Sequence, residues 1–244
     1  MCAGVELHYE EHGTGDPVLL LHGFTSSFAG TWKRTGWVEL LVAQGRRVVG
    51  LDFPGHGESA PGETVERCCG RSLAEDVLAL LDGLGLRAVD LVGFSMGGGV
   101  ALRVAMSHRE RVRRLVIGGV GDAAVNAFHD PEQVARIASA FEGDEPADAV
   151  AARIRQNAQL AGNDPRALLP YLRGGGWPGG LDDLLPVTAP VLMFVPENDW
   201  YMGETQAIRR WLSHAEVLTL PGRDHHSALV DDELRARVVR FLAG

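Results

Sequence analysis

The stretch LVGFSMGGG, residues 91–99, decides how this chain folds. It places Ser95 between Gly93 and Gly97, with an apolar run before it and another after it. This pattern predicts a strand that ends at Ser95 and a helix that begins there. Side chains beside Ser95 would collide with both elements in so sharp a turn, which accounts for the flanking glycines. Two interpretations stay open here: a tight turn with a bystander serine, or a nucleophile mounted on the bend.

Short apolar runs alternate with amphipathic stretches along most of the chain, which is typical of βαβ units and a largely parallel sheet. The runs predict strands at 17–23, 46–55, 88–94, 112–120, 190–199 and 215–222, with a half-exposed edge strand within 4–13. Apolar residues at helical spacing predict helices over 72–86, from Ser95 onward, and over 231–242. Ser72 and Glu75 predict a capping box at the start of the first helix.

Residues 121–186 interrupt this alternation. They are rich in Ala, Arg and Gln at helical spacing and contain no strand pattern, so they predict a helical cap or lid. The glycine run around Trp177 is not followed by Gly-Lys-Ser/Thr, so a flexible connection is favoured over a phosphate loop. We therefore expect a core made of residues 1–120 and 187–244, with the cap inserted between them.

The composition is that of an ordinary α/β domain, with 244 residues, 45% of them apolar and 23% charged. The net charge of −9 and the lack of a basic patch argue against nucleic acid and anionic membranes as partners. No apolar run approaches the roughly 18 residues of a membrane span, and the first residues do not resemble a signal peptide. Cys2, Cys68 and Cys69 lack disulfide or metal spacing, so reduced thiols in the cytoplasm are expected.

Further chemically active side chains come directly after predicted strands. The sequence HGF ends one strand at 22–24, DFPGHGES follows the next at 52–59, PENDW carries Asp199, and PGRDHH carries His225 and His226. A serine, an acid and a histidine therefore follow one another in the order Ser95, Asp199, His225, each at the carboxyl end of a strand. Trypsin and subtilisin use two other orders.

With these motifs the sequence resembles the α/β-hydrolase superfamily over essentially its whole length. The resemblance implies an α/β fold, a mostly parallel α/β-hydrolase sheet with helices on both faces and a helical cap insertion. The turn at Ser95 in particular resembles that of the bacterial esterases also called cofactor-free haloperoxidases. Haloalkane dehalogenases and epoxide hydrolases carry aspartate at this position, so serine argues against both.

The resemblance implies a serine carboxylesterase that cleaves small to medium carboxylic esters through an acyl-enzyme. Ser95 would be the nucleophile, which needs a neighbouring base because its hydroxyl is otherwise a poor one. His225 would take the proton and return it to the leaving alcohol, and Asp199 would orient the imidazole. The backbone N–H groups of Phe24 and Met96 would form the oxyanion hole.

Several assignments have a rival. Asp122 follows the end of the strand 112–120, a place from which some α/β-hydrolases supply the acid, although aspartate there is also a common helix N-cap. Asp199 is likewise explained as a turn or cap residue. Phe128, Trp177 and Trp200 are expected to line the substrate pocket, but packing within the core or the cap explains them equally well.

Other functions use the same residues. A lactonase, thioesterase, C–C bond hydrolase or perhydrolase would carry the same triad, and the fold also serves as a non-catalytic ligand receptor. His22 and His56 are attributed to hydrogen bonding within loops rather than to catalysis. No His, Cys, Asp or Glu group has metal-ligand spacing, so we expect no metal and no cofactor, only a small-molecule ester as partner. The pattern gives no indication of oligomeric state.

Overall fold

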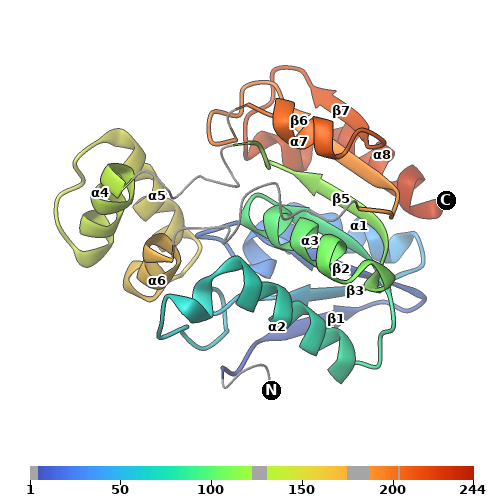
Figure 1. Ribbon diagram of the computed structural model, residues 1–244, viewed down its shortest axis with the longest axis horizontal. Helices are drawn as coiled ribbons and strands as arrows, with labels where there is room; N and C mark the ends of the chain where they lie inside the picture. The colour runs from blue at the N-terminus through green and yellow to red at the C-terminus, as the bar shows by residue number, and fades with distance from the viewer. Residues whose placement is uncertain (1–4, 123–130, 175–186, 203) are drawn as a thin grey trace.

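The computed structural model describes residues 5–122, 131–174, 187–202 and 204–244 (Figure 1). Seven strands of these residues form one sheet in the order β1-β3-β2-β4-β5-β6-β7. All neighbours pair in parallel except β1, which pairs with β3 in antiparallel register at the edge. The predicted mostly parallel sheet and its half-exposed edge strand are confirmed.

The strands overlap the predicted ranges: β1 (Tyr9–His12), β2 (Asp16–Leu21), β3 (Arg46–Leu51), β4 (Val89–Phe94), β5 (Val112–Gly118), β6 (Val191–Pro196) and β7 (Glu216–Leu220). The helices are α1 (Trp37–Ala43), α2 (Gly70–Gly83), α3 (Met96–Ser107), α4 (Pro131–Glu142), α5 (Ala149–Leu160), α6 (Leu169–Arg173), α7 (Gln206–Trp211) and α8 (Asp232–Ala243). Because β2 to β7 all run in parallel, their carboxyl ends meet at one edge of the sheet.

Strand β2 shows how the sheet is buried on both faces. Its residues Val18 and Leu20 pack in one apolar cluster with α1 and α8, and the alternate residues Leu19 and Leu21 pack in another with α2 and α3. All four side chains are fully buried. The period of two along a strand sends neighbours to opposite faces, so a continuous apolar run requires helices on both. Figure 1 shows these two helical layers with the sheet between them.

The start of α2 differs from the prediction. The helix begins at Gly70, and Ser72 lies inside its first turn, where its Oγ donates to the carbonyl oxygen of Glu66 at 2.7 Å. The expected capping box of Ser72 with Glu75 is therefore wrong. A 3-10 turn at Glu66–Cys68 supplies a carbonyl that takes the serine hydroxyl, so this side chain does not cap the helix.

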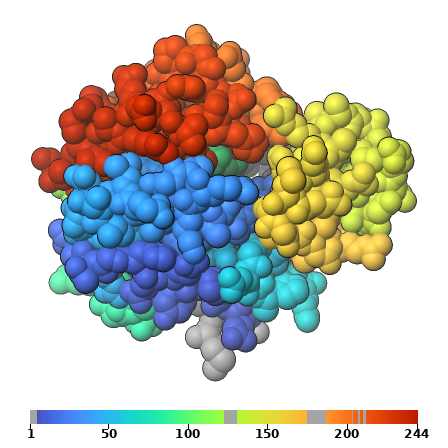
Figure 2. Space-filling model, turned by 180° about the vertical axis from the view of Figure 1, so that it is seen from behind, coloured from blue at the N-terminus to red at the C-terminus, as the bar shows by residue number. Residues whose placement is uncertain are grey.

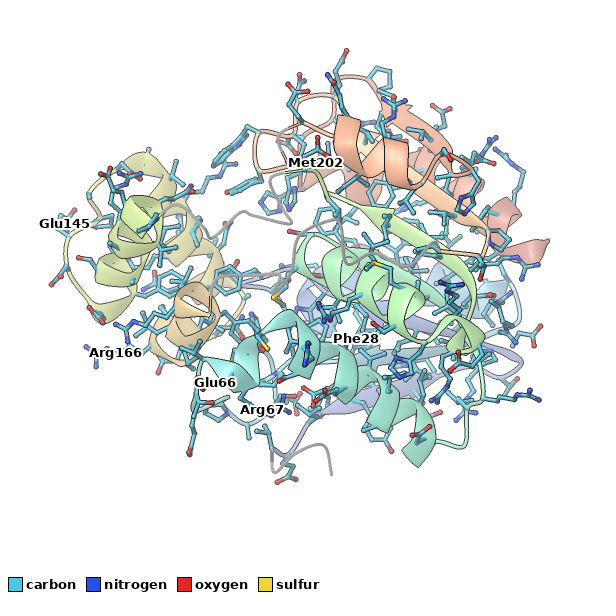
Figure 3. The ribbon with its side chains drawn as sticks, viewed as in Figure 1. Phe28, Glu66, Arg67, Glu145, Arg166 and Met202 are labelled. Carbon is cyan, nitrogen blue, oxygen red and sulfur yellow. The ribbon has the colours of Figure 1, made fainter. Side chains whose placement is uncertain are left out.

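Helices α4, α5 and α6 lie together to one side of the sheet (Figure 1). They share an apolar cluster of their own, which includes Ile137, Phe141, Ile154 and Leu168. Glu145 and Arg166 lie on the outer side of this group, away from the sheet (Figure 3). The part of the predicted insertion that the structure describes thus holds three α-helices, one short 3-10 helix at Pro165–Leu168 and no strand. The boundaries of the insertion stay a prediction.

In the described ranges, no helix is both long enough and apolar enough to cross a membrane.

Candidate active site

Ser95 sits in a strained turn between β4 and α3. Its backbone has φ 55° and ψ −121°, and Thr25 is the one other described non-glycine residue with positive φ. Such a conformation costs about 1–3 kcal/mol, so it persists where the surroundings impose it. The Ser95 N–H donates to the carbonyl oxygen of Gly118 at 2.8 Å, and its own carbonyl accepts from the Gly99 N–H at 3.0 Å. The turn is thereby fixed to β5 on one side and to α3 on the other.

The two flanking glycines are required by close approach of the backbone. A Cβ atom on Gly93 would lie 2.3 Å from the carbonyl oxygen of Gly97, and one on Gly97 would lie 2.3 Å from that of Leu21. Neither backbone oxygen can move without displacing a strand or a helix. The physical reason for the G-x-S-x-G spacing is therefore present at both positions.

Asp199 and His225 come together from the ends of β6 and β7. His225 Nδ1 donates to Asp199 Oδ2 at 2.7 Å, and the Asp199 side chain is wholly shielded from solvent. The other carboxylate oxygen, Oδ1, accepts from the backbone N–H groups of Tyr201 and Met202, each at 3.1 Å. Met202 lies in the loop that follows β6 (Figure 3). Both carboxylate oxygens are thus held, and one of them fixes the orientation of the imidazole.

The ring of His225 is packed, whereas His226 is exposed. The His225 ring centroid lies 4.6 Å from that of Phe94 and 5.0 Å from that of Tyr201. Ring planes tilted at these separations make favourable contacts. Of the two adjacent histidines, His225 is the one whose ring contacts Asp199 and packs on Phe94, the last residue of β4.

Asp122 has another partner. Its Oδ1 accepts from the backbone N–H of Ile208 at 2.8 Å, in the first turn of α7. This carboxylate therefore binds a free N–H group in the first turn of α7, a helix that begins more than eighty residues later.

Ser95 and His225 line one cavity of about 810 Å³. Phe24, Met96 and Trp200 line the same cavity, and Asp199 lies behind His225. Phe128 and Trp177 lie outside the described residues. Figure 2 shows α4–α6 as a lobe beside the rest of the molecule, with the surface hollowed where the lobe meets segments near both ends of the chain.

The cavity has walls from the core and from the insertion. Val150 and Ile154 of α5 and Ile137 of α4 line it opposite the core residues. Phe24 connects the two parts, because its ring stacks on Phe141 of α4 with centroids 6.3 Å apart. Trp200 is 49% exposed and stacks on Tyr201 with centroids 3.7 Å apart. The walls near Ser95 are therefore largely apolar, as in most small-molecule sites.

Two buried histidines hold the loop that carries Phe24. His22 Nδ1 donates to the carbonyl oxygen of Gly23 at 2.9 Å, and its Nε2 accepts from the Phe53 N–H at 3.0 Å. One ring nitrogen donates and the other accepts, and only the neutral imidazole can do both. Burial accordingly lowers the pKa of His22, although the Asp52 carboxylate opposes this shift.

His56 makes the same kind of bridge in the neighbouring loop. Its Nδ1 donates to the carbonyl oxygen of Pro54 at 3.1 Å, and its Nε2 accepts from the Thr25 N–H at 3.2 Å. Complete burial, together with the nearby His22 ring, lowers the pKa of His56 well below its ordinary value. The sequence motifs indicated loop hydrogen bonds for both histidines, but not which backbone groups they join.

Within the ranges that the structure describes, no three His, Cys, Asp or Glu side chains are placed to hold a metal ion.

The sheet order and the strained serine turn at the carboxyl edge of the sheet are features of one class of α/β fold. The family model for the alpha/beta hydrolase fold matches residues 16–142, and the chain belongs to that family.

Three similar proteins illustrate the likeness. A 2-hydroxymuconate semialdehyde hydrolase from Pseudomonas putida is 39% identical over 122 residues, a match that covers 50% of this chain and 42% of that protein. The matched region is thus less than half of that relative. The crystal structure of a bromoperoxidase from Bacillus anthracis superposes with a TM-score of 0.73 at 25% identity, covering 98% of this chain and 96% of that one. An epoxide hydrolase from Vigna radiata shares the fold, with a TM-score of 0.73 at 19% identity over 98% and 95% of the two chains.

Proposed function

We propose that this protein is a serine hydrolase that cleaves small to medium carboxylic esters through an acyl-enzyme. One observation carries the proposal: Ser95, on its strained turn, and the Asp199-bonded His225 ring line the same cavity. Acyl transfer needs a nucleophile and a base that open into the same cavity, with a third group that orients the base.

The proposed reaction has two halves. As Ser95 Oγ attacks the ester carbonyl carbon, His225 Nε2 takes the hydroxyl proton and then gives it to the departing alkoxide. Asp199 keeps Nδ1 protonated and stabilises the imidazolium formed in each step. A water molecule, activated by the same nitrogen, then attacks the acyl carbon, and Ser95 leaves with its proton restored.

The negative charge that develops on the carbonyl oxygen needs donors already in place. We assign this role to the backbone N–H groups of Phe24 and Met96, because both residues line the cavity with Ser95. Met96 is the first residue of α3, so its N–H points out of the positive end of that helix. Each such donor contributes about 3 kcal/mol to transition-state stabilisation.

Hydrolysis of a C–C bond is the second candidate. It is favoured by the 39% identity to a 2-hydroxymuconate semialdehyde hydrolase, although that match covers less than half of the relative. Other relatives are epoxide hydrolases. We do not propose that activity here, because the residue on the strained turn is Ser95, and the family resemblance implies aspartate for epoxide opening.

The experiment is turnover of p-nitrophenyl acetate and butyrate, followed by labelling with a fluorophosphonate. We expect both esters to be cleaved, the label to be found on Ser95, and Ser95→Ala to lose turnover by several orders of magnitude while it folds normally. EDTA should leave the activity intact. Ligand binding without turnover would instead indicate a receptor, and cleavage of an enol-ketone but of no ester would indicate a C–C hydrolase.

A further inference from the structure

Arg34 is the one lysine or arginine among the described residues that line the cavity, and no described aspartate or glutamate lines it. The side chain is exposed as well, so the guanidinium lies where the cavity meets solvent. In the part of the chain that the structure describes, it has neither an ion pair nor a side-chain hydrogen bond. An arginine in this position presents its donors to whatever enters the cavity.

Two hydroxyl groups lie beside this guanidinium. Thr31 Oγ1 donates to Ser26 Oγ at 2.9 Å, so the Ser26 proton is left for another acceptor, and no described residue provides one. Ser26, Thr31 and Arg34 all line the cavity. Ser26 therefore offers a hydroxyl donor and Arg34 a guanidinium on one side of the cavity, while Thr31 holds the Ser26 oxygen in place.

Ser26 Oγ and Arg34 Nη2 are neighbours across Gly30. A Cβ atom on Gly30 would lie 2.7 Å from Ser26 Oγ and 3.5 Å from Arg34 Nη2, so any side chain here would crowd the serine hydroxyl. Gly30 itself lines the cavity. Because the hydroxyl and the guanidinium lie this close together at the cavity wall, a planar anion with two oxygens suits the pair of donors.

We infer that Ser26 and Arg34 form a carboxylate-binding subsite in which Thr31 orients the Ser26 hydroxyl, so that the preferred substrate is an ester with a second, ionised carboxyl group. The cleavage of the ester bond rests on the proposed function, whereas the preference for an anion rests on Ser26 and Arg34. The chain as a whole carries a net charge of −9, which repels anions in general. Attraction of an anionic substrate to the cavity would therefore come from Arg34 itself. The anion can sit on either side of the ester bond.

The test compares anionic and neutral esters of equal length. Monomethyl and dimethyl esters of succinic to suberic acid place the charge on the acyl side, and acetate esters of hydroxy acids place it on the alcohol side. We expect the wild type to prefer an anionic ester of one length. Arg34→Gln should lower kcat/KM for that ester about tenfold or more, since a hydrogen bond to a charged group is lost. The value for the neutral ester should not change.

Arg240→Gln is the matched control, because Arg240 is an exposed arginine of α8 that does not line the cavity. It should leave both kcat/KM values unchanged. Equal losses for anionic and neutral esters in Arg34→Gln would overturn the inference, and so would a wild type with no anionic preference at any length.

Binding separates this inference from the esterase proposal. If the wild type cleaves no ester, adipate and the other dicarboxylates are titrated into wild type and Arg34→Gln by calorimetry. A Kd about tenfold weaker in the variant would keep the subsite and refute only the esterase. Failure of every dicarboxylate to bind the wild type would refute the subsite itself.

Discussion

His225 Nδ1 lies 2.7 Å from Asp199 Oδ2, and the carboxylate that accepts this bond is completely shielded from solvent. Two backbone N–H groups hold the other oxygen of Asp199. The carboxylate therefore accepts three hydrogen bonds, and no lysine or arginine of the described residues forms an ion pair with it. Its charge is left to act on the imidazole, which makes this contact the most informative place to test the proposed mechanism.

Replacement of Asp199 by asparagine should cut turnover by about three to four orders of magnitude, because the amide no longer holds the imidazole in its working tautomer. Asp122→Asn is the matched control, since that residue caps α7 through Ile208 and an amide oxygen can still accept this bond. Its turnover should change little. Steady-state kinetics of both folded variants at one pH show which aspartate orients His225. Equal or inverted losses of turnover would assign that role to Asp122.

The adjacent histidines make a second pair. His225→Ala should reduce turnover by several orders of magnitude, because the base and the contact with Asp199 are both removed. His226→Ala should keep most of the activity, since that ring is exposed and does not contact the carboxylate. A variant of His226 as inactive as that of His225, with both shown to be folded by circular dichroism, would contradict this assignment.

Much of the fold could be predicted from the sequence because its signals are local. A buried strand such as β2 shows a continuous apolar run, and the turn at Ser95 shows its glycines within two residues. The capping box at Ser72 was wrong because a carbonyl six residues earlier competes for the same hydroxyl. Its presence depends on a short 3-10 turn for which the pattern has no signal.

The candidate site likewise has parts with a local sequence signal and parts without one. Strand order brings Ser95, Asp199 and His225 to one edge, so chain order and strand ends were sufficient to nominate them. The hydrogen bond between Asp122 and Ile208, and the cavity wall that contains Ser26 and Arg34, form only when the chain has folded. The catalytic roles of the nominated residues stay predictions until the variants are measured.

The glycines near Ser95 can be compared by their effect on stability when each is replaced by alanine. Gly93→Ala should strongly destabilise the protein or prevent folding, because the new Cβ would lie 2.3 Å from the carbonyl oxygen of Gly97. Gly99→Ala, in the same helix as Gly97, meets nothing within 4 Å and should stabilise by about 0.5–1 kcal/mol. Urea unfolding gives both values. Similar effects of the two substitutions would show that the backbone is less closely packed here than the structure indicates.

The insertion should select substrates by chain length. Val150 of α5 lines the cavity, so Val150→Phe should lower the ratio of kcat/KM for p-nitrophenyl hexanoate to that for the acetate by about tenfold. Gln156→Phe places the same ring on an exposed position of the same helix and should leave the ratio unchanged. If Val150→Phe lowers the melting temperature and leaves the ratio as it was, α5 acts as a stability element and not as a wall of the site.

The two buried histidines predict how stability depends on pH. In the folded protein burial lowers the pKa of His22 and of His56 below the value of about 6.5 that an unfolded chain has. As the pH falls through 6.5, the unfolded chain binds protons that the folded protein does not, so the free energy of unfolding decreases. Each histidine contributes a slope of up to about 1.4 kcal/mol per pH unit in this window.

His56→Gln should flatten that slope between pH 7 and pH 5, measured as the free energy of urea unfolding at several pH values. The variant loses some stability at pH 7, because glutamine cannot bridge the Pro54 carbonyl and the Thr25 N–H as the imidazole does. At pH 5 the difference from wild type should shrink, since the wild type has by then lost the contribution of neutral His56. His214→Gln, at an exposed position outside this network, should keep the wild-type slope. An unchanged slope in His56→Gln would show that His56 takes up its proton in the folded state as readily as in the unfolded one.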